Sequence, residues 1–76
     1  MTNLTAIVND VWPDGRTSLA ARLDISRQAL HALLTGRHAR KPHRLLGDLF
    51  DALHAHDRSL RKHRIVRAWE ADHEAA

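Results

Sequence analysis

The sequence contains no cysteine, no tyrosine and one phenylalanine among its 76 residues. Without cysteine the chain can form neither disulfide bonds nor cysteine-ligated zinc sites, and a reducing, intracellular setting fits this composition. The scarcity of aromatic residues, together with the lack of sustained apolar–polar alternation, argues against a β-sheet. The length suffices for one domain with a small core, which calls for tight helix packing, a partner subunit or both.

Long hydrophobic runs are also missing. No stretch of about 18 apolar residues is present, so the sequence predicts no transmembrane helix and no membrane partner. The N-terminal segment MTNLTAIVNDVW has no basic region ahead of an apolar run, so it does not have the pattern of a signal peptide. We therefore expect a cytoplasmic protein.

Positive charge is concentrated in the middle of the chain. The formal net charge is only +3, but seven of the twelve Lys and Arg residues lie between Arg16 and Arg44, where Asp24 is the one acid. The other five lie between Arg58 and Arg67. A basic middle on a nearly neutral chain is typical of a face that binds a polyanion. On charge alone, an arginine-rich solvated surface stays open as the alternative.

Apolar residues recur at intervals of three and four, which is typical of amphipathic helices. The first such segment follows Thr2 or Asn3 as its cap and ends at the WPDG turn. A later one opens at Pro42, which suits a first helical position. A last, heavily charged helix covers about residues 58–74. The prediction is an all-α fold, a compact bundle of about five short helices that forms a single domain over residues 1–76.

The stretch SLAARLDISRQALHALLTG, residues 18–36, contains two helical stripes interrupted by LDIS. In one continuous helix Ile25 would point about 200° away from Leu23, so the two side chains would not share a buried face. A turn over residues 24–26 removes this conflict. The stretch therefore predicts two short helices joined by a turn.

Each residue of the turn has a defined task. Asp24 tolerates the left-handed backbone better than most residues. Ile25 fills the space between the two helices, and Ser26 caps the second helix with its hydroxyl. The second helix is predicted over about residues 26–35, with Gly36 as its C-terminal cap.

The spacing of this pair is that of a helix-turn-helix. Counted from Arg16, the apolar residues occupy positions four, eight, ten, fifteen and eighteen, and a small residue occupies position five; they are Leu19, Leu23, Ile25, Leu30, Leu33 and Ala20. Asp24 departs from the pattern at position nine, where glycine is usual. With the glycine after the second helix, the basic connector and the proline that opens the next helix, residues 15–53 resemble the lambda-repressor-like helix-turn-helix family of phage Cro proteins and small bacterial repressors.

The resemblance implies that the second helix enters the major groove of double-stranded DNA by its N-terminal end. The predicted base-contacting residues are Ser26, Arg27, Gln28, His31, Ala32 and Thr35. Among these, Gln28 suits adenine and Arg27 suits guanine. The predicted phosphate-contacting residues are Arg16, Arg37, His38, Arg40, Lys41 and Arg44. For both sets the alternative is an ordinary solvated surface.

An apolar stripe of Ile65, Val66 and Trp69 lies on the last helix. One helix-turn-helix of this size contacts few base pairs, and such repressors usually pair two copies on half-sites one helical turn apart. We therefore predict a homodimer through this stripe on an inverted-repeat operator. The alternative is that Trp69 folds back on its own core, against Trp12 or Phe50.

The seven histidines predict no metal site. His54 and His56 stand two positions apart, which on a helix places them on different faces, and no cysteine or dense group of carboxylates completes a ligand set. The serines lack the context of a catalytic nucleophile, and no glycine-rich loop is present to hold a phosphate. Neither enzymatic activity nor a cofactor is expected.

These observations predict a sequence-specific DNA-binding transcriptional regulator, a repressor that occupies its operator in the bacterial cytoplasm or nucleoid. Its small size is similar to that of regulators carried by phages and other mobile elements. The alternative function is a protein-binding helix-turn-helix module, such as an antitoxin or an inhibitor, whose partner is another protein. The basic charge of residues 37–44 disfavours this alternative.

Overall fold

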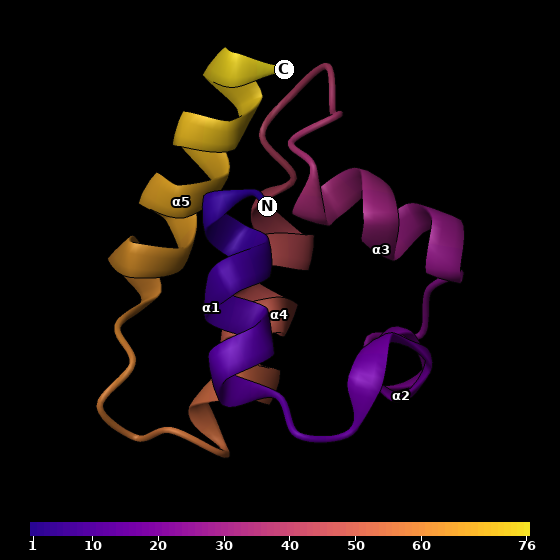
Figure 1. Ribbon diagram of the computed structural model, residues 1–76, viewed down its shortest axis with the longest axis vertical. Coiled ribbons are helices and arrows are strands. Elements are labelled where there is room, and N and C mark those ends of the chain that lie inside the picture. Colours follow the sequence, from indigo (N-terminus) through magenta and orange to yellow (C-terminus); the bar gives the residue numbers. More distant parts are fainter.

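The computed structural model describes all 76 residues and contains five α-helices and no strand (Figure 1). The helices are α1 (Asn3–Val11), α2 (Gly15–Arg22), α3 (Arg27–Leu34), α4 (His43–His54) and α5 (Lys62–Ala75). The predicted all-α class and the number of helices are confirmed. None of the five combines the length and the hydropathy that crossing a membrane requires.

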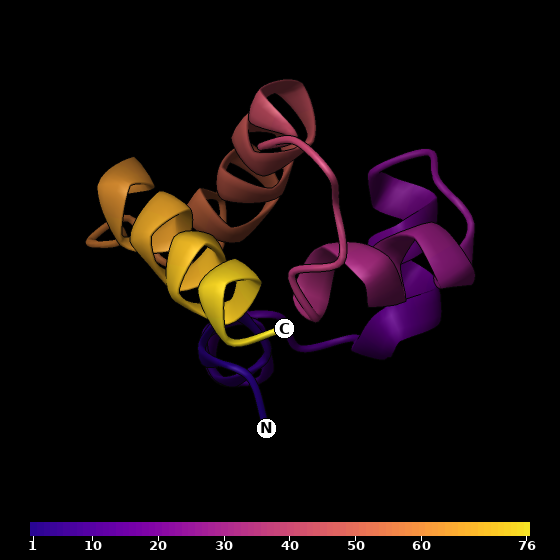
Figure 2. The same cartoon turned by 90° about the horizontal axis from the view of Figure 1, so that it is seen from above.

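The helices form two groups. In both views α5 lies on one side of the molecule and the α2–α3 pair on the other, with α1 and α4 between them (Figure 1, Figure 2). α5 packs directly against α1 and α4, whereas α2 packs against α3. The molecule measures 28 × 26 × 23 Å, and the C-terminal end of α5 reaches the residue that follows α3, where His73 bonds to Gly36.

One hydrophobic core joins all five helices. It contains 17 buried apolar residues, and its fully buried members include Leu4, Leu19, Leu33, Leu49 and Ile65, one from each helix. Since every helix contributes, the α2–α3 pair is held rigidly against the rest of the bundle by burial of its leucines.

Two helix boundaries differ from the predicted ones. α4 begins at His43, with Pro42 as the capping residue before it rather than its first helical residue. α5 begins at Lys62 rather than near residue 58, because the carboxylate of Asp57 accepts hydrogen bonds from the backbone N–H and the hydroxyl of Ser59. These bonds fix a turn that places the side chain of Leu60 in the core. The helix begins only after this turn.

The predicted contact between two copies through the α5 stripe requires correction. Ile65 and Trp69 are 0% and 2% exposed within the single chain, and only Val66 is partly accessible. The indole of Trp69 stacks on the imidazole of His73, with ring centroids 4.6 Å apart. Ile65 and Trp69 therefore belong to the core of one chain, and only the partly accessible Val66 remains of the predicted contact surface.

Candidate nucleic-acid interface

The turn between α2 and α3 has the predicted conformation. Asp24 adopts a left-handed backbone with φ of 56°. Ile25 is partly buried against the core, and its N–H donates to the carbonyl of Ala20 at 3.0 Å. The Ser26 hydroxyl accepts a hydrogen bond from the N–H of Ala29 at 3.0 Å and so caps α3. These contacts set a fixed angle between the two helices.

α3 is two-sided. Leu30, Leu33 and Leu34 are buried, whereas its first turn and outer face are exposed. Of the predicted base-contacting residues, the exposed ones are Ser26, Arg27, Gln28 and His31, and the partly buried ones are Ala32 and Thr35.

Thr35 is less available than its neighbours on the outer face. Its hydroxyl donates to the carbonyl oxygen of His31 at 2.8 Å, so toward an external group it acts only as an acceptor. The side chains left to donate hydrogen bonds therefore lie in the N-terminal half of α3.

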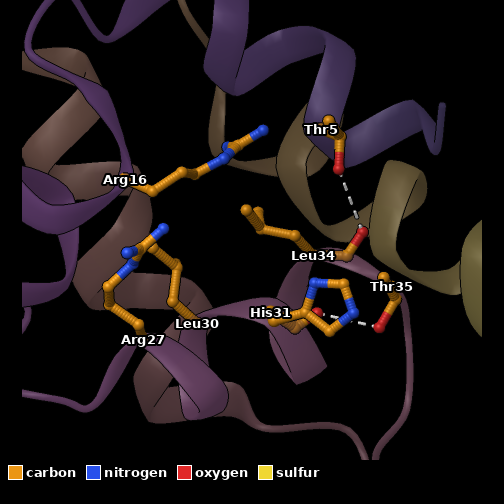
Figure 3. Close-up of a pocket in the computed structure, with 7 residues that line it drawn as sticks. All are labelled: Thr5, Arg16, Arg27, Leu30, His31, Leu34 and Thr35. Atoms are coloured by element: carbon orange, nitrogen blue, oxygen red, sulfur yellow. Dashed lines mark hydrogen bonds between the residues drawn. The ribbon is translucent and has the colours of Figure 1, made fainter.

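A hollow of about 260 Å³ lies beside this face, between α1, α2 and α3 (Figure 3). Its lining residues are Thr5, Arg16, Arg27, Leu30, His31, Leu34 and Thr35. The structure therefore brings three predicted base-contacting residues together with a predicted phosphate-contacting one. Two guanidinium groups and an imidazole line the hollow, and no carboxylate does, which favours an anionic group there.

Arg16 is held in place for such a contact. One terminal nitrogen of its guanidinium donates to Oδ1 of Asn9 at 3.0 Å, which ties α2 to α1. The other terminal nitrogen is buried and has no hydrogen-bond partner within the chain. A buried donor without a partner costs free energy, and an acceptor oxygen brought to it removes that cost. Sequence reasoning anticipated the charge of Arg16 but missed the role of Asn9.

The remaining predicted phosphate-contacting residues fall into three environments. Arg37 and Arg40 are exposed in the connector after α3, and His38 is partly buried beside them. Lys41 is engaged by the fold, because its Nζ lies 2.5 Å from a carboxylate oxygen of Glu70 on α5. Arg44 is exposed at the start of α4, away from the other members of the set.

The surroundings of Arg44 are mixed in charge. It lines a separate hollow with Leu23, Asp24, Ile25, Leu45 and Asp48. Two carboxylates share this hollow, so its local charge is not basic. Arg44 therefore does not belong to the cationic group around the first hollow.

The C-terminal end of α3 is fixed by residues that sequence reasoning missed. Gly36 takes the predicted left-handed conformation, with φ of 71°, and Nδ1 of His73 donates to its carbonyl oxygen at 2.8 Å. The hydroxyl of Thr2 donates to the carbonyl of Leu34. His73 and Thr2 stand 37 and 32 positions from the residues to which they bond, and no local signal points to them.

The histidines are distributed over the bundle. His56 contacts the edge of Trp12, with ring centroids 4.9 Å apart, and His54 stacks on Phe50 at 5.0 Å. No three His, Asp or Glu side chains come together in a way that could hold a metal ion. The histidines near the ends of α4 and α5 serve packing contacts of this kind.

No family model, no curated protein and no solved structure matches this chain.

Proposed function

We propose that the protein is a sequence-specific DNA-binding regulator that reads duplex DNA with the N-terminal half of α3. One observation carries the proposal. Three buried leucines hold one face of α3 against the core, and the opposite face exposes Arg27, Gln28 and His31 to solvent. The side chains of these three exposed residues form no hydrogen bond or ion pair within the chain. A rigid helix with free polar side chains at its exposed start is suited to reading base edges.

The dimensions agree with this function. An α-helix with its side chains is about 10–12 Å in diameter, and the major groove is about 12 Å wide, so α3 fits into the groove. The amide of Gln28 pairs with adenine and the guanidinium of Arg27 with guanine, each through two hydrogen bonds. Arg16, which lines the adjoining hollow, then meets a backbone phosphate and fixes the register of α3 on the duplex.

In this proposal the protein acts by occupancy, as a repressor that excludes polymerase from its operator. A single α3 reads too few base pairs to specify one site in a genome, so the proposal includes two copies on an inverted repeat. The pairing surface lies outside the core stripe of Ile65 and Trp69, because both residues are buried within one chain.

The experiment that tests the proposal is selection of bound sequences from random duplex DNA, followed by affinity measurements on the best sequence and on a random one. Gln28→Ala should weaken binding to the selected sequence by about 1–3 kcal/mol and leave affinity for random DNA nearly unchanged. The matched control is Arg22→Ala, which removes an exposed arginine at the far end of α2 and should not change sequence preference.

Failure of the selection to enrich any sequence would reject the proposal and favour the protein-binding alternative. Equal losses for Gln28→Ala on both duplexes would reject direct readout by this residue.

A further inference from the structure

A second basic surface covers the start of α5 and the loop before it. Its members are all exposed: Arg58, Arg61, Lys62, His63, Arg64 and Arg67. We call this set the α5 basic surface. The one ion pair in the chain joins Lys41 to Glu70 elsewhere, so none of these side chains is neutralised by a salt bridge.

The fold itself does not account for this charge. α5 carries no acidic residue in its first turn, where an acid would be stabilising, and carries basic residues there instead. Its acidic residues stand in the second half, where Glu70 pairs with Lys41 and Asp72 accepts hydrogen bonds from the start of α1. Glu70 and Asp72 therefore serve contacts within the molecule, whereas the Lys and Arg residues of α5 form no hydrogen bond or ion pair, and those in its first turn oppose the helix dipole.

Asp57, in the loop before α5, is already engaged. Its carboxylate accepts two hydrogen bonds from Ser59, at 2.6 and 3.0 Å. Five Lys and Arg residues follow it within ten positions of the sequence, so it compensates only part of their charge. The α5 basic surface is therefore a local excess of positive charge that an external anion would neutralise.

The composition of the surface selects the kind of anion. It contains no Phe, Tyr or Trp side chain on which an unpaired base could stack. The apolar face of α5, with Ile65, Ala68 and Trp69, is buried in the core, so the helix cannot lie with that face in a lipid bilayer. Arg64 and Arg67 lie one turn apart on α5, and Arg61 is the capping residue directly before the helix, so the three follow one another at intervals of three, which suits a row of phosphates.

We infer that the α5 basic surface binds the phosphate backbone of a second DNA duplex without regard to its sequence. In both views the first half of α5 lies across the bundle from α3, whereas the C-terminal end of α5 approaches the end of α3, where His73 bonds to Gly36 (Figure 1, Figure 2). One straight duplex seated on α3 therefore does not reach this surface. The protein holds an operator on one side and a second segment of duplex on the other, and so bridges them.

Bridging rests on the proposed function, but the contact made by α5 does not. The test uses an operator duplex fixed to beads and a labelled random-sequence duplex in solution, with the full-length chain added. The variant Arg61→Ala/Arg64→Ala/Arg67→Ala should reduce capture of the labelled duplex by roughly tenfold or more at low salt. Its affinity for the bead-bound operator should change by less than about threefold. The matched control, Arg61→Lys/Arg64→Lys/Arg67→Lys, keeps the charge and should retain bridging.

A second arm separates this inference from the proposed function. In the chain with Arg27→Ala/Gln28→Ala, affinity for the random duplex should still fall when the three α5 arginines are replaced by alanine. That result combined with a failed operator selection would reject the proposed function and leave the α5 contact standing. Full bridging by the triple alanine variant would overturn the inference and assign bridging to two α3 faces of a dimer.

Binding of the α5 basic surface to phosphatidylserine vesicles with no binding of the second duplex would also overturn the inference. All three substituted side chains are exposed, and circular dichroism melting checks that the variant folds. If the triple variant fails to fold, Arg67→Ala alone should lower the slope of log affinity against log salt for the random duplex by about one unit. An unchanged slope would reject the contact.

Discussion

The carboxylate of Asp72 on α5 accepts hydrogen bonds from the backbone N–H groups of Asn3 and Leu4, at 2.8 and 3.0 Å. These N–H groups belong to the first turn of α1 and have no partner within that helix. A negative charge at the N-terminus of a helix also interacts favourably with its dipole. Asp72, which is 6% exposed, therefore caps the first turn of α1, although almost the whole sequence separates the two.

Asp72→Ala should lower the free energy of unfolding by about 1–3 kcal/mol, because two partly buried N–H groups lose their acceptor. Asp72→Asn should cost less, since its amide oxygen still accepts one bond. Urea unfolding measures both. Glu74→Ala, an exposed acid two positions further on, is the control, and an equal effect of Glu74→Ala and Asp72→Ala would contradict the capping role.

The glycine at the end of α3 should tolerate no side chain. A Cβ atom on Gly36 would lie 2.6 Å from the backbone nitrogen of His73, and its φ of 71° adds strain. Gly15 has φ of 83° but nothing within 4 Å of its Cβ position. Gly15→Ala should therefore lower the free energy of unfolding only by the backbone strain of the left-handed conformation, about 1–2 kcal/mol. Gly36→Ala should destabilise the protein clearly more than this in thermal unfolding. Equal losses would show that α5 does not press against the end of α3.

The connector arginines should contribute to DNA affinity more than the neighbouring lysine does. Arg37 and Arg40 are exposed, whereas Nζ of Lys41 is held by Glu70. Arg37→Ala/Arg40→Ala should flatten the slope of log affinity against log salt by up to about two units, on every sequence alike. Lys41→Ala should change the slope by less than one arginine does. Titrations that give Lys41→Ala the larger effect would show that DNA displaces Glu70 from the lysine.

The stability of the turn before α5 should depend on pH. Hydrogen bonds from the hydroxyl and then from the N–H of Ser59 lower the pKa of the Asp57 carboxyl, with a smaller contribution from Arg64. Because the pKa is lowered in the folded state, the stabilisation is present above the ordinary value of about 3.9 and is lost as the pH falls below it. In Ser59→Ala the pKa of Asp57 should rise toward that value in an NMR titration of the carboxyl carbon. An unchanged titration would contradict these hydrogen bonds.

Local chemistry made the α2–α3 turn predictable. Asp24 tolerates a left-handed backbone, Ser26 caps the following helix and Gly36 ends it, and each of these features depends only on neighbouring residues. The start of α5 was misplaced because the hydrogen bonds of Asp57 compete with helix formation, and helical periodicity does not register this competition.

The features that sequence patterns did not predict depend on contacts between residues far apart in the chain. The stripe of Ile65 and Trp69 has the same spacing whether it faces the chain's own core or a second copy, so only packing decides between the two. The ion pair of Lys41 with Glu70 joins residues 29 positions apart and turns a predicted DNA contact into a structural one. Neither outcome has a signal in the nearby sequence.

The cap supplied by Asp72 has a consequence for synthesis of the protein. As the chain leaves the ribosome, the segment that becomes α1 emerges first, with its apolar stripe of Leu4, Ile7 and Val8. The hydroxyl of Thr2 already caps it locally, but the acceptor for the N–H groups of Asn3 and Leu4 arrives only when Asp72 has been added, together with the α5 face that covers the stripe. The nascent chain therefore carries this hydrophobic segment without its α5 partner until then, and a product truncated before Asp72 is open to chaperones and proteases.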